Sequence, residues 1–281
     1  MKNFYLEFGS ENNKKKYMIK KVVGSDAYNL WHLAVRLKEK YNLITLLQKK
    51  TSFDKIPRKQ KFFLFFLCYE ISKTNRILEL GSSSLEIIEG VNLVSKVLKK
   101  KTLPRNTIYS GVEIDNAMNL LGYQISKNFY KNITTFNKLN KFFKFYKYKK
   151  KFFFHDLGVS MYNFQNAKEF ASNLNRFDSG YIKVVFSKGK TKKLNPSGKT
   201  AYAFSIKEVI KYLKKPIYIV MKENPNNWDM ISNKNKDRFI FGYFYFGNRI
   251  VQLKKSINYY SKFNLKIKNY IKKNILFKEL N

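Results

Sequence analysis

The sequence predicts an α/β protein whose strands form a mostly parallel β-sheet with helices on both faces. Between residues 75 and 223, short apolar runs alternate five times with segments whose apolar residues have helical spacing. The apolar runs are nearly continuous, which is typical of strands that are buried on both faces. Strands and helices that alternate in this way favour a Rossmann-like architecture.

The elements are expected in a regular order along the chain. The strands are predicted at 76–80, 107–114, 152–157, 180–187 and 216–223. The helices that connect them are predicted at 84–100, 116–130, 162–174 and 203–215. This order is interrupted by three basic stretches, interpreted as insertions, at 99–107, 132–151 and 187–200.

The two ends of the chain are expected to add to this domain. Residues 1–72 are predicted to form a helical N-terminal extension, with Asp26 as the N-cap of a helix. The α/β domain is expected at 73–255. Its last part, 237–253, contains two β-rich runs, which predict an antiparallel C-terminal hairpin at the sheet edge. Residues 256–281 are expected to be a basic C-terminal segment.

The chain is strongly basic. Its 281 residues include 56 Lys and Arg against 19 Asp and Glu, which gives a formal net charge of +37. A field of this sign attracts RNA, anionic lipid or acidic glycans. A composition rich in Lys, Asn, Ile, Phe and Tyr and poor in Arg is also what AT-rich codons produce. The charge therefore has two interpretations, which are a polyanionic partner and codon usage.

The composition also bears on the class of protein. Hydrophobic residues make up 44% of the chain, which is typical of a globular protein. A single cysteine, Cys68, excludes an internal disulfide framework and fits a reducing compartment. The N-terminus has no apolar signal region, and the most apolar run, 62–71, is about half of the ~20 residues that a membrane span needs. We therefore expect a soluble, cytoplasmic protein.

The stretch NRILELGSSS, residues 75–84, leads from a predicted strand to a predicted helix through small residues. Open parallel sheets bind ligands at the carboxyl ends of their strands, where such a turn lets the backbone approach the ligand. Glu113 ends the second predicted strand, where a carboxylate accepts hydrogen bonds from the hydroxyls of a ribose. Asp156 ends the third predicted strand, where it can accept one from an adenine amino group. Acids at successive strand ends therefore predict ligand binding.

The segments ILELGSSS, YSGVEID, FFFHDL, YIKVVFS and PIYIVMKE, in this order, resemble the motifs of class I S-adenosylmethionine-dependent methyltransferases. The resemblance covers roughly residues 75–253. It implies S-adenosylmethionine as the cofactor, held by Glu79, Gly81, Ser82, Ser83, Glu113, Asp156 and Leu157. In this family the loop after the first strand usually repeats glycine at alternate positions, and here Ser83 and Leu85 stand at the later ones.

The resemblance also constrains the methyl acceptor. An amino acceptor usually goes with an Asn/Asp-Pro-Pro-aromatic motif after the fourth strand, and the predicted fourth strand is followed by Phe-Ser-Lys-Gly at 186–189. Methylation of a ribose hydroxyl usually uses two lysines, an aspartate and a glutamate. Lys222 and Glu223 suit that set, but no Asp ends the predicted fourth strand. There is no carboxylate cluster after the last two strands, so we expect no metal.

Few side chains are candidates for acceptor chemistry. His155 is a candidate general base because histidine titrates near neutral pH, and the alternative is a strand-end histidine with a structural role. Trp228, Asn224 and Asn227 follow the last predicted parallel strand, where an aromatic ring and amides can contact a sugar.

Three functions remain open. The first is methyl transfer to a small molecule, with a sugar hydroxyl as the expected acceptor, since the helical extension before a short core is also similar to sugar O-methyltransferases. The second is an RNA methyltransferase, which the charge and the aromatic, basic stretch 141–153 favour. The third is a binding protein without catalysis on a degenerate methyltransferase fold.

Overall fold

A computed structural model of the chain describes residues 4–8, 15–19, 27–100, 106–127, 130, 132–146, 151–194, 200–227, 231 and 233–280. The chain divides into two compact units. The first unit contains Met1–Phe63 and Ser82–Phe145, and the second contains Leu64–Gly81 and Tyr146–Asn281. Parallel strands that alternate with helices occur in both units, so the predicted α/β class is confirmed.

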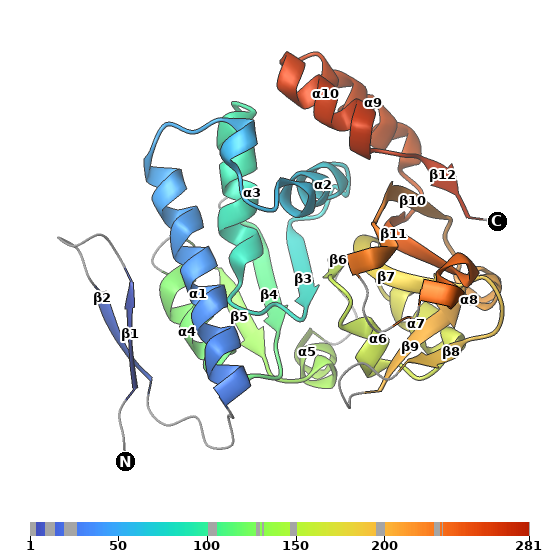
Figure 1. The fold of residues 1–281 in the computed structure, drawn as a ribbon, viewed down its shortest axis with the longest axis horizontal. Helices are drawn as coiled ribbons and strands as arrows, with labels where there is room; N and C mark the ends of the chain where they lie inside the picture. Colours follow the sequence, from blue (N-terminus) through green and yellow to red (C-terminus); the bar gives the residue numbers. More distant parts are fainter. Residues whose placement is uncertain are drawn as a thin grey trace. The chain divides into compact units, whose positions relative to one another are not determined.

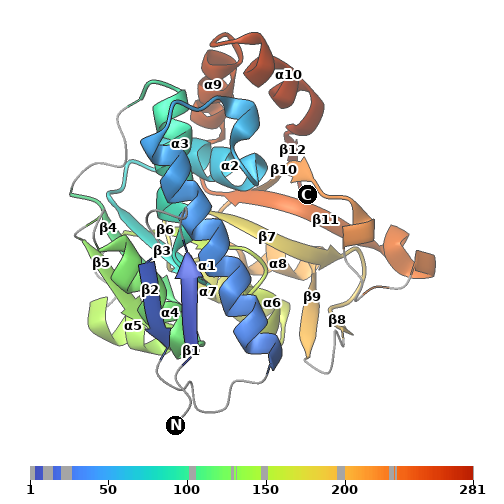
Figure 2. The same cartoon turned by 60° about the vertical axis from the view of Figure 1, so that its left-hand side comes forward.

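The first unit contains a parallel strand pair and the helices that follow and precede it. Strand β4 (Ile108–Val112) pairs in parallel with β5 (Ile133–Phe136). The helices are α1 (Ala27–Gln48), α3 (Glu86–Val97), α4 (Asn116–Ser126) and α5 (Leu139–Tyr146). Helix α1 lies beside α3 and α4, as Figures 1 and 2 show. Its apolar side packs against α4 through Leu33, Leu37, Ile44, Met118, Leu121 and Ile125.

In the second unit, six strands of the ten-stranded sheet pair in the order β12-β10-β11-β7-β6-β3. Strands β3 (Arg76–Leu80), β6 (Phe153–Asp156) and β7 (Ser179–Ser187) are parallel. Strands β10 (Ile217–Lys222), β11 (Phe239–Phe246) and β12 (Lys278–Glu279) pair antiparallel. The carboxyl end of β7 also pairs with β9 (Ala201–Ser205), and β9 pairs with β8 (Lys192–Leu194).

The helices of the second unit connect these strands and extend beyond them. They are α6 (Ser160–Asn163), α7 (Ala167–Leu174), α8 (Ile206–Tyr212), α9 (Ile250–Ser261) and α10 (Leu265–Asn274). Single 3-10 turns occur at Phe53–Lys55, Pro225–Asn227 and Asn233–Arg238. Helix α2 (Lys59–Glu70) begins in the first unit and ends in the second. Within the described part of the chain, no helix is long and apolar enough to cross a membrane.

The parallel strands confirm most of the predicted positions, but one strand was missed. The run ITTF forms β5, inside the stretch at 132–151 that was interpreted as an insertion, and α5 follows it. Strand β6 is therefore the fourth strand of the alternating series and not the third. The prediction that 180–187 is the fourth strand was wrong for the same reason, because this segment forms the fifth, β7.

The ends of the chain also differ from the prediction. Residues Phe4–Phe8 and Lys15–Ile19 form an antiparallel strand pair, β1 and β2, ahead of the predicted helices. At the other end, β11 is an antiparallel strand as predicted, but the second run of the expected hairpin begins helix α9. Its buried residues Leu253, Ile257 and Tyr260 are three and four apart, which is the period of a helix. The predicted N-cap Asp26 lies outside the described residues.

Candidate functional site

The loop after β3 has an alternating backbone. Gly81, Ser83 and Leu85 have positive φ angles of 69°, 50° and 59°. Glycine adopts this left-handed conformation without steric cost, whereas for other residues it costs about 1–2 kcal/mol. These are the alternate positions at which the family that the sequence resembles repeats glycine. The chain therefore keeps the left-handed backbone at positions 83 and 85 without glycine there.

The strand-end acid of the first unit is tied to this loop. The backbone N–H of Ser83 donates to Glu113 Oε2 over 2.8 Å, and the N–H of Asp115 donates to Oε1 over 3.1 Å. The N–H of Ser82 donates to the Val112 carbonyl over 3.1 Å. Burial raises the pKa of Glu113, and the two backbone donors oppose that shift. Each carboxylate oxygen keeps a further lone pair, so Glu113 can still accept hydrogen bonds from a ligand.

A fully buried lysine supports the far end of the loop. Lys40 of α1 donates to the Leu85 carbonyl over 3.3 Å, to Glu89 Oε2 over 2.7 Å and to Ser126 Oγ over 2.7 Å. Ser126 in turn donates to Glu89 Oε1 over 3.2 Å. Three helices of the first unit thus converge on the left-handed residue Leu85. No sequence pattern indicates this contact, because Lys40 is far along the chain from Leu85, Glu89 and Ser126.

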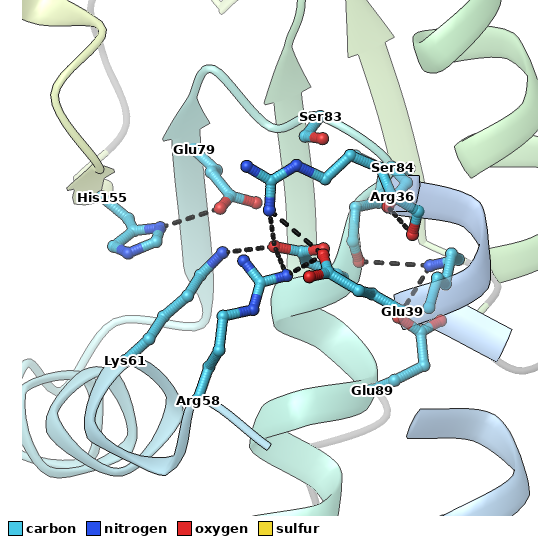
Figure 3. Close-up of polar contacts among 12 residues, drawn as sticks. Arg36, Glu39, Arg58, Lys61, Glu79, Ser83, Ser84, Glu89 and His155 are labelled. Atoms are coloured by element: carbon cyan, nitrogen blue, oxygen red, sulfur yellow. Dashed lines mark hydrogen bonds and ion pairs between the residues drawn. The ribbon is translucent and has the colours of Figure 1, made fainter. Parts of the chain in front are cut away.

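A second buried acid of the first unit lies among cations. Glu86 Oε1 is 2.8 Å from Lys61 Nζ, 3.0 Å from Arg58 Nη2 and 3.9 Å from Arg36 Nη1. Glu39, which is partly exposed, pairs with both arginines, as Figure 3 shows. Burial raises the pKa of Glu86, but Lys61 and the two arginines outweigh burial and lower it to about 2. Two acids and three cations are thus grouped around the first turn of α3.

In the second unit, Glu79 and His155 form a buried pair. Their register in the parallel sheet places them side by side, and His155 Nδ1 lies 3.0 Å from Glu79 Oε1 (Figure 3). The imidazole packs edge-on against Phe65 and stacks on Tyr181. Both members of the pair are buried. This placement favours the structural interpretation of His155, and its use as a general base stays a prediction.

Asp156 is also fully buried, in the turn that begins α6. Its carboxylate accepts the N–H of Val159 over 2.8 Å and that of Ser160 over 3.3 Å. Burial raises the pKa of Asp156 to about 7, against the lowering effect of these hydrogen bonds. The turn also requires Gly81, because a Cβ on Gly81 would lie 2.1 Å from Val159 Cγ2. Leu157 is half-buried in this turn.

The missed strand β5 changes which residue follows the third strand. Asp156 was predicted to face the adenine because it seemed to end that strand, and it ends the fourth. Asn137 is the residue that follows β5, in the first unit, as Glu113 follows β4. Its Oδ1 is buried and has no hydrogen-bond partner among the described residues. The short run ITTF was the only signal for this position.

The fifth strand carries a half-buried ion pair in the second unit. Lys183 Nζ in β7 lies 2.8 Å from Oε1 of Glu223, which follows β10. The ammonium also lies 5.6 Å from the centre of the Tyr243 ring, and this ring stacks on Tyr181. A lysine inside the run GYIKVVFS was a signal for this pair, since it is the one charged residue of a buried strand. Lys222, suggested beside Glu223, is exposed.

The predicted acceptor residues are only partly described. Asn224 is exposed, and its Oδ1 accepts the N–H of Asn226 over 2.9 Å. Asn227 belongs to a 3-10 turn, and Trp228 lies outside the described residues. In the described part of the chain, no three His, Cys, Asp or Glu side chains are grouped so that they could hold a metal ion.

No protein-family model and no curated protein matches the chain. Among solved structures, it is similar to the O-methyltransferase of the trans-AT PKS multienzyme of Brevibacillus brevis in complex with S-adenosyl-L-homocysteine. The identity is 14%, the match covers 89% of this chain and 92% of that chain, and the TM-score is 0.49. The N-terminal domain of EvdMO1 with SAH bound is 11% identical, with 68% and 80% covered and a TM-score of 0.47.

Coclaurine N-methyltransferase bound to N-methylheliamine and SAH is 8% identical, with 79% of this chain and 89% of that chain covered and a TM-score of 0.45. Two of these three structures are named as methyltransferases, one an O-methyltransferase and the other an N-methyltransferase, and all three contain S-adenosylhomocysteine. At these identities and TM-scores the likeness assigns neither an activity nor an acceptor to this chain.

Proposed function

We propose that the chain is an S-adenosylmethionine-dependent methyltransferase. The observation that carries this proposal is the alternating left-handed loop at residues 81–85, tied through the Ser83 N–H to the strand-end carboxylate Glu113. A loop that holds strained residues at positions 83 and 85 points to a functional constraint on its backbone. Strained backbone of this kind clusters at ligand-binding and active sites.

The residues of the first unit fit the nucleoside part of the cofactor. Glu113 has lone pairs left for two ribose hydroxyls after it has accepted the two backbone N–H groups. Asn137 offers a buried carbonyl oxygen without a partner among the described residues, which suits an adenine amino group. When bound, the cofactor supplies a methyl group on an activated sulfonium, so the chain itself has to bind, orient and remove a proton.

We propose a hydroxyl oxygen as the acceptor, with the hydroxyl of a small-molecule sugar as the first candidate. The fourth strand ends in Asp-Leu-Gly-Val at 156–159, which lacks the two prolines and the aromatic residue associated with amino acceptors. A hydroxyl must lose its proton as the methyl group arrives, and the Glu223 carboxylate is the candidate to accept that proton. Glu223 also orients Lys183, 2.8 Å away, whose ammonium can stabilise the developing alkoxide.

A ribose hydroxyl of RNA is the second candidate, because the corrected strand order removes an objection to it. An aspartate was missing from the end of the predicted fourth strand, and Asp156 ends the actual fourth strand, β6. Together with Lys183 and Glu223 it supplies three of the four residues that the family resemblance associates with this acceptor.

The cofactor proposal is tested by calorimetric titration with S-adenosylhomocysteine. We expect the Glu113→Ala variant to lose at least tenfold in affinity, because the ribose loses its acceptor. Glu279→Ala removes an exposed acid of β12 and is the matched control, with unchanged affinity expected. Lack of binding by the folded wild-type protein, or an equal loss in both variants, would contradict the proposal.

The acceptor proposal is tested separately by transfer of a labelled methyl group to a panel of sugars and to RNA. We expect Lys183→Met to bind S-adenosylhomocysteine as the wild type does and to lose methyl transfer. Loss of binding in Lys183→Met would place this residue in cofactor binding and not in acceptor chemistry.

A further inference from the structure

Helices α9 and α10 form a helical hairpin in the second unit, as the two adjacent red helices in Figures 1 and 2 show. Each helix buries one apolar side, through Leu253, Ile257 and Tyr260 in α9 and through Ile267 and Ile271 in α10. All seven lysines between residues 250 and 274 are exposed. The hairpin is therefore an amphipathic layer whose own charged side chains between residues 250 and 274 are all lysines, and the acid that contacts it is Glu70, which accepts from Ser256 and Tyr260.

The charge of this hairpin is not simply the average of the chain. No Asp or Glu occurs between Asp237 and Glu279, so no acid of the hairpin itself offsets the lysines. Helices α7 and α8 of the same unit each carry an acid in the first turn, Glu169 and Glu208, whereas α9 and α10 have none.

We propose that the outer side of α9 and α10 binds the sugar–phosphate backbone of single-stranded RNA. A row of lysines attracts phosphates as point charges and lacks the planar fork with which Arg reads base edges, so the expected binding is independent of sequence. Tyr259 is 53% exposed on this side, and its ring stands edge-on to Tyr260, which holds it in place. An exposed ring among lysines gives a base a surface to stack on.

An anionic membrane is the competing partner for a basic helix pair. A helix that inserts into a lipid surface needs a free apolar face beside its lysines. Here five apolar side chains of the two helices are buried within the unit, and the exposed side carries Val251, Tyr259 and Leu265 beside seven lysines. The surface therefore suits phosphates in water better than acyl chains. This binding surface does not depend on the proposed methyl transfer.

The test measures fluorescence anisotropy of a labelled 20-nucleotide single-stranded RNA of mixed sequence, titrated with the full chain at several salt concentrations. The variants are Lys254→Glu/Lys255→Glu in α9 and Lys272→Glu/Lys273→Glu in α10. We expect each to weaken binding at least tenfold and to reduce the salt slope by about 1.4, since one lost phosphate contact lowers the slope by about 0.7. The melting temperature of each variant confirms that it is folded.

The matched control is Lys207→Glu/Lys211→Glu in α8, which changes the net charge by the same amount in the same unit. We expect its salt slope to equal that of the wild type. Tyr259→Ala should weaken binding several-fold without changing the slope, because stacking is not electrostatic. Equal slopes in all three lysine variants would overturn the proposal in favour of diffuse attraction. Binding to vesicles of phosphatidylserine and phosphatidylcholine, without binding to RNA, would overturn it in favour of a membrane.

Discussion

Glu86 in the first unit and Asp156 in the second are both almost fully buried carboxyl groups, and their pKa values move in opposite directions. Burial raises both. Beside Glu86, three cations outweigh burial and bring its pKa to about 2. Asp156 has hydrogen-bond donors but forms no ion pair among the described residues, and its pKa is about 7. Even in a chain with a net charge of +37, the location of the cations and not their number decides how a buried acid titrates.

The largest expected effect comes from removing the cations that distinguish the two acids. In Arg58→Met/Lys61→Met, Glu86 loses its two nearest cations. We expect the free energy of unfolding at pH 7 to fall by about 5 kcal/mol, because a buried charge is left with only Arg36, 3.9 Å away. Urea denaturation measures this loss. Lys55→Met removes an exposed lysine nearby and should change stability by no more than about 0.5 kcal/mol. Similar small changes in both variants would show that Glu86 does not depend on these cations.

Asp156→Asn tests the other acid. The folded-state pKa of Asp156 is raised, so its contribution to stability is fully present below the unfolded-state pKa of about 3.9 and is lost as pH rises through 7. For a shift of this size the loss is about 4 kcal/mol. We expect the asparagine variant to lack this decline in a series of urea denaturations between pH 4 and pH 8. A variant with the same pH profile as the wild type would show that Asp156 is ionised at neutral pH.

Glu86→Gln should produce the opposite pH dependence. The folded-state pKa of Glu86 is lowered, so its contribution is present above about pH 4.5 and is lost as pH falls toward 2. The expected size is about 3 kcal/mol. Denaturation curves of the wild type and the variant, recorded from pH 6 down to pH 3, should therefore converge at the acid end. Parallel curves would mean that the cations stabilise α3 without this carboxylate.

The smallest effect is expected at Glu39, which pairs with Arg36 and Arg58 but is 38% exposed. Glu39→Gln should cost about 0.5 kcal/mol at pH 7, because water screens an exposed pair. Its thermal unfolding is best measured beside that of Glu86→Gln. If Glu39→Gln lowered the free energy of unfolding as much as Glu86→Gln, burial would not determine how much each ion pair stabilises the fold.

The parallel strands were predictable because a strand that is buried on both faces consists of a nearly continuous run of apolar residues. The segment RILEL forms β3 over the predicted residues, and Glu113 directly follows β4, close to the predicted strand end. Strand β5 was missed because its four residues contain two threonines and stand among lysines. The start of helix α9 was predicted to be a strand because Ile and Val are common in strands. The helical spacing of its buried residues, Leu253, Ile257 and Tyr260, extends beyond the predicted run.

The ionic contacts of the site were beyond sequence reasoning for a different reason. Lys40 and Glu89 lie on separate helices, and nothing in either segment indicates the partner. The chain has many other Lys and Glu residues. This pair differs from them because it is buried, and burial depends on the fold. Lys183 did carry a local signal, as a charged residue within an apolar strand, whereas its partner Glu223 became evident only when β7 and β10 were placed in one sheet.

The contact of Lys40 with Leu85 has a consequence for any shortened form of the protein. A chain trimmed to start after α1 would lack the ammonium that neutralises Glu89 and holds the Leu85 carbonyl. Such a fragment would retain every motif that resembles the methyltransferases and still have an unpaired charge in its interior beside the loop. Helix α1 is therefore a built-in part of the loop's scaffold, and the smallest useful fragment for expression has to include it.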